Sequence, residues 1–207
     1  MERATAAARD GQAFVISPDL TLAEVAAIVS TRLAGFGIDV CVVGGSAITL
    51  HSADAYTSHD IDLAILTGID RRSIEMALSG LGYERDGRVF VHPRSSWTID
   101  IVADTPYIAN RPVKTYAEIQ TKFGLVRTLE IEDAIADRIA AFLFWNDSQS
   151  LEIAETLCGR RAPDVRWSRL TKALDALEAT DATSAQNLSF ATRRLRKTIS
   201  DQGGEVN

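Results

Sequence analysis

Two hydrophobic periods divide the first half of the chain into helices and strands. In residues 21–37 apolar side chains recur every three or four positions, which predicts a helix that ends at Gly35 or Gly37. Helices are also predicted at 44–53 and 69–82. Short apolar or alternating runs rich in β-branched residues predict strands, and they lie at 38–43, 58–66, 87–92 and 97–103. The turn sequence PRSS between the last two runs predicts a hairpin.

The pattern changes near residue 129. Residues 105–125 are mixed, with one strand expected near VKTYAEI (113–119). Beyond them a helical period predominates, and helices are predicted at 132–146, 150–159, 164–179 and 184–200. We therefore expect an α+β fold, with a mixed sheet in a core at 1–126 and a helical portion at 127–207 packed on it. The apolar run AFLFWN (141–146) is expected to form the seam between them.

Composition limits the class of protein. At 207 residues, with 46% hydrophobic and 24% charged side chains, the chain can bury a sizeable core. No window approaches 18 uninterrupted apolar residues, and the N-terminus has no apolar signal region, so we expect a cytoplasmic protein without a membrane partner. Cys41 and Cys158 match no zinc-ligand spacing, and Cys41 is expected to be a small buried hydrophobe.

The net charge of −6 argues against a protein that coats nucleic acid through general electrostatics. The charge is uneven, however, because residues 151–207 carry nine basic and eight acidic side chains. Basic residues cluster at 160–172 and at 193–197. The favoured interpretation is that they cover solvated helix faces, and the alternative is a contact with RNA or phosphate.

Two aspartates stand inside the strand-like run HDIDLAI. Residues i and i+2 of a strand share a face, so Asp60 and Asp62 project side by side while Ile61 and Leu63 point into the core. A third acid, Asp100, has an equally apolar setting in WTIDIV. If the two strands are neighbours, three carboxylates converge. Like charges at that distance repel one another, and a bound divalent cation would relieve the repulsion.

Oxygen-only ligands favour Mg²⁺ or Mn²⁺, and such ions commonly bridge carboxylates and substrate phosphates. Gly44-Gly45-Ser46, between a predicted strand and a predicted helix, fits the same chemistry. Glycine lets a phosphate approach the backbone, and the helix N-terminus supplies N–H donors. We expect the Ser46 hydroxyl to donate to the terminal phosphates. Alone, each motif is usually an ordinary turn; their order along the chain favours phosphoryl or nucleotidyl chemistry.

These motifs resemble the DNA polymerase beta-type nucleotidyltransferase superfamily, and GGSA…SHDIDLAI is especially similar to its AbiEii/AbiGii toxin-like group. The resemblance covers residues 38–103. It implies metal binding and catalysis by Asp60, Asp62 and Asp100, and nucleotide binding by residues 44–46. A weaker similarity at 132–154 implies that Arg138 contacts nucleotide phosphates and that Asp147 is a further acid of the nucleotide site.

The sequence departs from these relatives in two places. Tyr56 stands where an arginine is common, although Ser58 is kept, and Arg138 stands where a lysine is common. An arginine keeps the charge but changes the hydrogen-bond geometry.

The leading hypothesis is a metal-dependent nucleotidyltransferase that moves an NMP from an NTP to an acceptor hydroxyl. The acceptor would be a tRNA 3′ end, a protein or a small molecule. The resemblance also suggests the toxin of a toxin–antitoxin pair, with an antitoxin protein as partner. The alternative is a degenerate, non-catalytic nucleotidyltransferase-fold module that binds a nucleotide or a protein.

Overall fold

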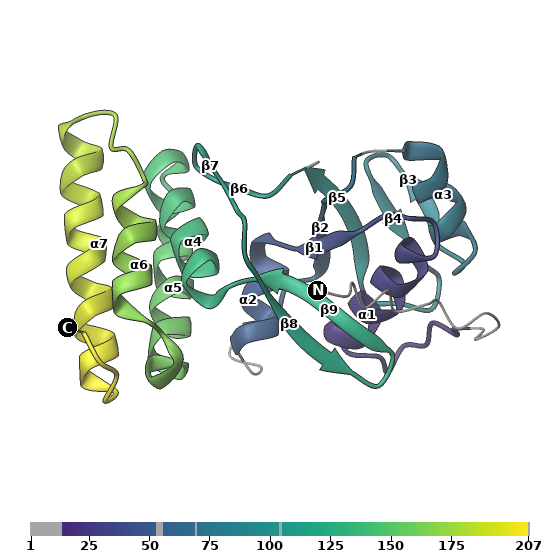
Figure 1. The fold of residues 1–207 in the computed structure, drawn as a ribbon, viewed down its shortest axis with the longest axis horizontal. Coiled ribbons are helices and arrows are strands. Elements are labelled where there is room, and N and C mark those ends of the chain that lie inside the picture. The colour runs from purple at the N-terminus through teal and green to yellow at the C-terminus, as the bar shows by residue number, and fades with distance from the viewer. Residues whose placement is uncertain (1–13, 53–55, 69, 104, 207) are drawn as a thin grey trace, which may run out of the picture.

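A mixed sheet forms the centre of one half of the molecule (Figure 1). The computed structural model describes residues 14–52, 56–68, 70–103 and 105–206. Among these residues seven strands pair in the order β3-β4-β5-β2-β1-β9-β8. Their bounds are Val40–Val42 (β1), Asp60–Ile65 (β2), Glu84–Asp86 (β3), Val89–Val91 (β4), Thr98–Ala103 (β5), Tyr116–Thr121 (β8) and Gly124–Leu129 (β9). A separate two-stranded hairpin joins β6 (Tyr107–Ile108) to β7 (Arg111–Pro112).

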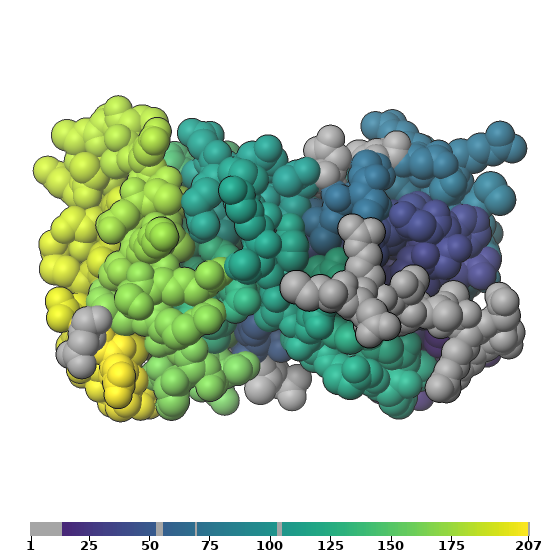
Figure 2. Space-filling view, viewed as in Figure 1, coloured from purple at the N-terminus to yellow at the C-terminus, as the bar shows by residue number. Residues whose placement is uncertain are grey.

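Seven α-helices are found in the described residues, three before the hairpin and four after β9. The first three are α1 (Leu22–Ala34), α2 (Gly44–Ser52) and α3 (Arg71–Ser79). The last four are α4 (Ile131–Trp145), α5 (Ser148–Arg160), α6 (Trp167–Asp175) and α7 (Ala182–Asp201). The space-filling view places α6 and α7 at one end of the molecule and the first elements of the chain at the other (Figure 2).

The expected α+β class with a mixed sheet is confirmed. Strands β1, β2, β4 and β5 form where the hydrophobic runs predict them, and β4 pairs antiparallel with β5 as the PRSS turn predicts. Strands β3, β6, β7 and β9 are additional. Strand β9 begins before residue 126, the expected end of the core, and continues to Leu129.

The two faces of the sheet pack on different helices. Ile61, Leu63 and Ile65 belong to a core that they share with buried residues of α1 and α3. Residues that point to the other face of the sheet, such as Cys41, belong to a second core formed with α2 and the four C-terminal helices. Cys41 is fully buried, as expected, and burial raises the pKa of its thiol to about 12. Asp60 and Asp62 therefore lie on the face that α2 shares with the helical portion.

Local capping explains where several helices begin. Thr21 and Glu24 form a reciprocal capping box at the start of α1. Asp70 and Asp181 accept backbone N–H groups at the starts of α3 and α7. None of the helices seen in the described ranges is long and apolar enough to cross a membrane.

The apolar run at 141–146 only partly forms the expected seam. Leu143 is buried in the core shared with α2, but Trp145 at the end of α4 is 75% exposed and Phe144 is 38% exposed. The expectation was wrong for Trp145 because the helix ends there, with Asn146 in a left-handed conformation (φ 54°). The chain turns before this ring can reach the sheet.

Candidate active site

Asp62 and Asp100 lie opposite each other on adjacent parallel strands. The β2–β5 register pairs Asp62 with Asp100 and Asp60 with Thr98. Paired residues of parallel neighbours project to the same face, and neighbouring strands are about 4.8 Å apart. Asp60, two residues before Asp62, shares that face. The structure thus brings together the three acids that the sequence singled out.

This arrangement perturbs Asp62. Burial, and to a smaller extent the nearby charges of Asp60 and Asp100, together raise the pKa of Asp62 to about 6. Arg138 acts in the opposite direction but does not offset them. The carboxylates therefore form a site in which like charges repel one another.

Asp100 is the most buried of the three acids, with 3% of its surface exposed. Its Oδ2 atom accepts a hydrogen bond from Nη2 of Arg88, at 2.8 Å. The Arg88 side chain extends from the turn between β3 and β4 and is 84% exposed. A solvated guanidinium therefore covers one oxygen of a buried carboxylate.

Gly44 allows the start of α2 to approach these acids. Its φ of +60° is in the left-handed region, and a Cβ at this position would lie 2.5 Å from Oδ2 of Asp62. Gly45 is nearly as confined, because its Cβ would lie 3.1 Å from the Tyr56 hydroxyl. The first glycine is thus required both by conformation and by space.

Ser46 connects the glycine turn to the acidic strand. Its hydroxyl donates to the carbonyl of Val43 (2.8 Å) and accepts the backbone N–H of Asp62 (3.0 Å), and the residue is fully buried. In this structure the hydroxyl faces the backbone of β1 and β2. Its expected donation to phosphate stays a prediction, and the contact that the structure shows is with the backbone of Asp62.

Ser58, which precedes β2, orients another of the acids. Its hydroxyl donates to Oδ1 of Asp60 at 2.7 Å, and its own N–H donates to Oγ1 of Thr49 in α2. Ser58 is buried, so this contact is sheltered from water. The serine that the sequence retains before the acid pair therefore fixes the direction of Asp60.

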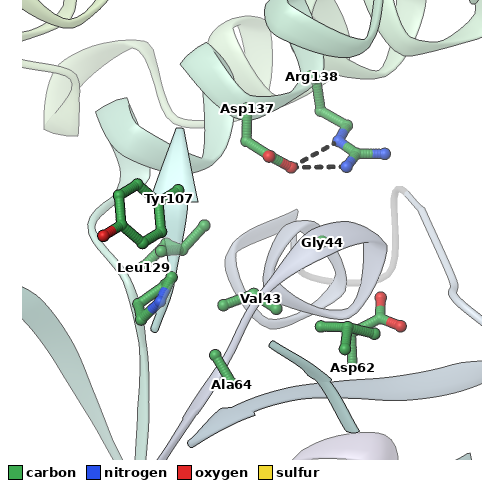
Figure 3. Close-up of a pocket in the computed structure, with 10 residues that line it drawn as sticks. Val43, Gly44, Asp62, Ala64, Tyr107, Leu129, Asp137 and Arg138 are labelled. Carbon is green, nitrogen blue, oxygen red and sulfur yellow. Dashed lines mark hydrogen bonds and ion pairs between the residues drawn. The ribbon is translucent and has the colours of Figure 1, made fainter. Parts of the chain in front are cut away.

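A pocket of about 270 Å³ opens beside the acids (Figure 3). Asp62 and Gly44 line one side, whereas Tyr107 and Leu129 line the other. The rest of the lining consists of Val43, Ala64, Val102 and Pro106, together with Asp137 and Arg138 of α4.

Arg138 lies in this pocket as part of an ion pair with its neighbour in sequence. Nε and Nη2 of Arg138 donate to Oδ2 of Asp137, at 3.2 and 2.6 Å. Arg138 also lies close enough to Asp62 to lower the pKa of that carboxyl. The expected contact between Arg138 and nucleotide phosphates stays a prediction, and the residue is placed next to the acids and the glycine turn.

Asp147 has a separate structural role. It caps α5, where Oδ1 accepts the N–H groups of Gln149 and Ser150 and Oδ2 accepts the Ser150 hydroxyl. The Ser150 hydroxyl is the main reason that the pKa of Asp147 is lowered. Asp147 does not line the pocket, and its expected role at the nucleotide site stays a prediction.

The carboxylates fit a metal site that is shared with substrate phosphates and water, and they do not fit a site made by protein side chains alone. Within residues 14–52, 56–68, 70–103 and 105–206, no three His, Cys, Asp or Glu side chains are gathered closely enough to hold a metal ion by themselves. Mg²⁺, however, is commonly held by one or two carboxylates together with phosphate oxygens and water. The raised pKa of Asp62 and the oxygen-only donors fit such a shared site.

Sequence reasoning did not identify Arg88, Tyr107 or Asp137. Asp137 is adjacent to Arg138 in α4, but successive residues of a helix do not face the same way, so the helical period does not indicate that both line one pocket. Arg88 and Tyr107 lie in a turn and in a two-residue strand, where no hydrophobic period exists to indicate their direction.

The first basic cluster has structural partners. Arg166 pairs with Glu130 and Glu132, and Arg169 pairs with Glu132 and Asp133. In the second cluster Arg193, Arg196 and Lys197 border an open surface hollow on α7. These two arginines differ from the expected solvated helix face, because they pair with the buried carboxylates of Glu132 and Asp133.

Comparisons with known proteins agree with the fold. No protein-family model and no curated protein sequence matches the chain. Among solved structures, an antigenic nucleotidyltransferase-like protein from Paracoccidioides brasiliensis is similar, with a TM-score of 0.53 and 15% identity over 86% of this chain and 94% of that one.

Two structures of the antibiotic-resistance factor ANT(2'')-Ia are more distantly similar. The solution structure has a TM-score of 0.43 and 15% identity, and it covers 87% of this chain and 93% of that one. The crystal structure with adenylyl-2''-tobramycin has a TM-score of 0.44 and 16% identity over 86% and 98%. From the sheet order and the similarity to the Paracoccidioides protein, the chain has the fold of a nucleotidyltransferase-like protein.

Proposed function

We propose that the protein is a metal-dependent nucleotidyltransferase. The observation that carries the proposal is the in-register pairing of Asp62 with Asp100, with Asp60 on the same face and the Gly44 turn against Asp62. A fold of this class supports the same reaction type.

The residues divide into two groups by chemistry. Asp60, Asp62 and Asp100 would hold Mg²⁺ or Mn²⁺, which when bound would neutralise charge on the phosphates and on the leaving pyrophosphate. The N–H groups at the start of α2 and the guanidinium of Arg138 would bind the phosphates of an NTP. Ser46 and Ser58 keep Asp62 and Asp60 in place through the contacts described above. Positioning and electrostatic stabilisation would account for most of the rate enhancement.

The acceptor and the biological setting belong to the same proposal. An acceptor hydroxyl would attack the α-phosphate and displace pyrophosphate, and a tRNA 3′ end, a protein hydroxyl and a small molecule all supply such a group. Membership of the AbiEii-type group and a toxin role stay predictions. Growth arrest on expression, relieved by Asp60→Ala, would support the toxin setting, and a cognate antitoxin protein would then be sought.

Calorimetric titration of ATP, CTP, GTP and UTP, with Mg²⁺ or with EDTA, tests the core of the proposal. We expect Mg²⁺-dependent binding that Asp62→Asn abolishes, followed by transfer of α-labelled nucleotide to an acceptor. Asp86→Asn, on the exposed strand β3, is the matched control and should bind like wild type. Nucleotide binding without metal dependence or turnover would favour the non-catalytic module. The absence of any nucleotide binding would contradict the enzyme and favour a module that binds a protein.

A further inference from the structure

We propose that the wall of the pocket formed by Tyr107, Val102 and Pro106 is the binding site for the nucleobase of the NTP, with the Tyr107 ring as its stacking surface. This inference rests on the proposed function. It goes further by assigning the non-reacting end of the substrate to residues outside the acidic motifs.

The pocket has two chemically different ends. Near Asp62 it is bounded by the carboxylate, the Gly44 turn and Arg138, all suited to a metal ion and phosphates. At the opposite side the close-up places Tyr107 beside Leu129 (Figure 3), and the apolar residues Val102 and Pro106, close to Tyr107 in the sequence, line the same pocket. A molecule that is charged at one end and a flat aromatic at the other matches this division, and a nucleoside triphosphate is such a molecule.

Tyr107 and Val102 are exposed although both are large and apolar. Tyr107 is 56% exposed and Val102 is 46% exposed, and both line the same pocket. Aromatic rings stack on every nucleobase because each base has a π-face, and Tyr has few rotatable bonds to immobilise. An exposed ring adjoining a phosphate-type site therefore offers both affinity and orientation.

The exposure of Tyr107 is set by a firmly held hairpin. Strand alternation turns Ile108, which is 1% exposed, into the core with α4, and turns Tyr107 outwards. The N–H of Val113 donates to the carbonyl of Pro106, at 2.9 Å. From β7, Arg111 donates to the buried carboxylate of Asp133 in α4, at 2.7 Å. The ring is thus presented by a fixed backbone.

The test measures the affinities of two kinds of ligand, with and without a nucleobase, for variants of Tyr107. Titrations use each of the four NTPs with Mg²⁺, and inorganic tripolyphosphate as the probe without a base. We expect Tyr107→Ala to weaken NTP binding by about tenfold, because that is the usual contribution of stacking on one aromatic ring. Tripolyphosphate binding should change by less than about twofold, since it makes no stacking contact. Tyr107→Phe should bind NTP like wild type because it keeps the ring.

The matched control is Phe190→Ala, which removes another exposed ring, on α7 and outside the pocket. It should leave both affinities unchanged, and melting temperatures should confirm that each variant is folded. Unchanged NTP affinity in Tyr107→Ala would overturn the base site, and so would an equal loss of tripolyphosphate affinity. In either case, Mg²⁺-dependent NTP binding by wild type would still support the proposed function. If wild type binds no NTP, the proposed function and this inference both fail.

Discussion

Asp62 lies directly opposite Asp100 in the parallel register of β2 and β5, so two carboxylates share one patch of a partly buried sheet face. The fold therefore holds together charges that repel each other. Its stability and its ligand binding should both respond to whatever neutralises them, whether a proton, a guanidinium or a metal ion.

The response to protons follows from the pKa of Asp62, which is raised from 3.8 to about 6 by burial and by the neighbouring acids. Since the folded protein disfavours the charged form, this contribution to stability is fully present below pH 3.8 and is lost as the pH rises through 6. We expect Asp62→Asn to be more stable than wild type above pH 6 in EDTA, with the difference vanishing near pH 4. Denaturant titrations across this range measure it, and a constant difference at all pH values would contradict the prediction.

Gly44→Ala should disrupt the site more than an ordinary glycine substitution does. The left-handed backbone costs a non-glycine residue about 1–2 kcal/mol, and the added Cβ would also collide with Oδ2 of Asp62. Gly37→Ala is the matched control, because its φ is +75° and nothing lies within 4 Å of the added Cβ. Both variants should lose stability, measured by urea denaturation, but only Gly44→Ala should lose Mg²⁺-dependent nucleotide binding. Equal nucleotide affinity in the two variants would show that the Asp62 side chain can move aside without loss of the site.

Ser46→Ala should destabilise the protein by about 1–3 kcal/mol, because it leaves the buried N–H of Asp62 and the carbonyl of Val43 without this partner. Ser30→Ala is the control: its hydroxyl is buried without a hydrogen-bond partner among the described residues, so its removal should cost little. The free energy of unfolding decides between them. If Ser46→Ala kept full stability and lost only tripolyphosphate affinity, the hydroxyl would serve phosphate and not the backbone.

Arg88→Gln should strengthen Mg²⁺ binding, because it removes a cation that competes for Oδ2 of Asp100. Stability in EDTA should fall, because the buried Asp100 carboxylate loses its guanidinium partner. Arg85→Gln provides the control, as Arg85 lies on the same hairpin and pairs with Glu75 instead. Calorimetric titration of Mg²⁺ into the three proteins measures the effect. Weaker Mg²⁺ binding in Arg88→Gln would mean that Arg88 supports the acids and does not compete for them.

Among the acids of the helical portion, Glu132 should cause the largest loss in the free energy of unfolding when it is replaced. It is fully buried and accepts hydrogen bonds from Arg166, which lower its pKa against the opposing effect of burial. Glu132→Gln should lose about 3 kcal/mol at pH 7. Because a lowered pKa stabilises the fold above pH 4.5, wild type should lose this contribution as the pH falls below that value.

Denaturation of Glu132→Gln and wild type at pH 7 and at pH 3.5 measures that loss. Glu130→Gln, which removes a more exposed partner of Arg166, should cost less than about 1 kcal/mol. Similar losses in the two glutamine variants would show that burial of Glu132 adds nothing to the ion pair.

The acidic centre could be predicted from the sequence because it lies on regular strands. The period of two determines that Asp60 and Asp62 share a face, and an apolar context placed Asp100 on another strand. Pairing of that strand with β2 was an inference, and the register of Asp62 with Asp100 is known only from the structure. The burial of Ser46 could not be predicted either, since a serine after two glycines suits a phosphate as well as a backbone amide.

The rest of the pocket comes from segments without a readable period. The hairpin with Tyr107 has two-residue strands, and its position depends on the contact between Arg111 and Asp133. The pairing of Arg88 with Asp100 depends on the direction in which the turn between β3 and β4 points the Arg88 side chain. Such contacts are decided by tertiary packing between residues far apart in the sequence, which local propensity does not encode.

The alternation of Ile61 and Leu63 with Asp60 and Asp62 has a consequence for folding. If β2 paired one residue out of step with β5, every side chain of β2 would exchange faces. Two carboxylates would enter the core against α1 and α3, and the isoleucine and leucine would face the pocket. Burying unpaired charges is so unfavourable that this misaligned state is strongly excluded. Asp60 and Asp62 thus help to specify the register in which β2 pairs with β5.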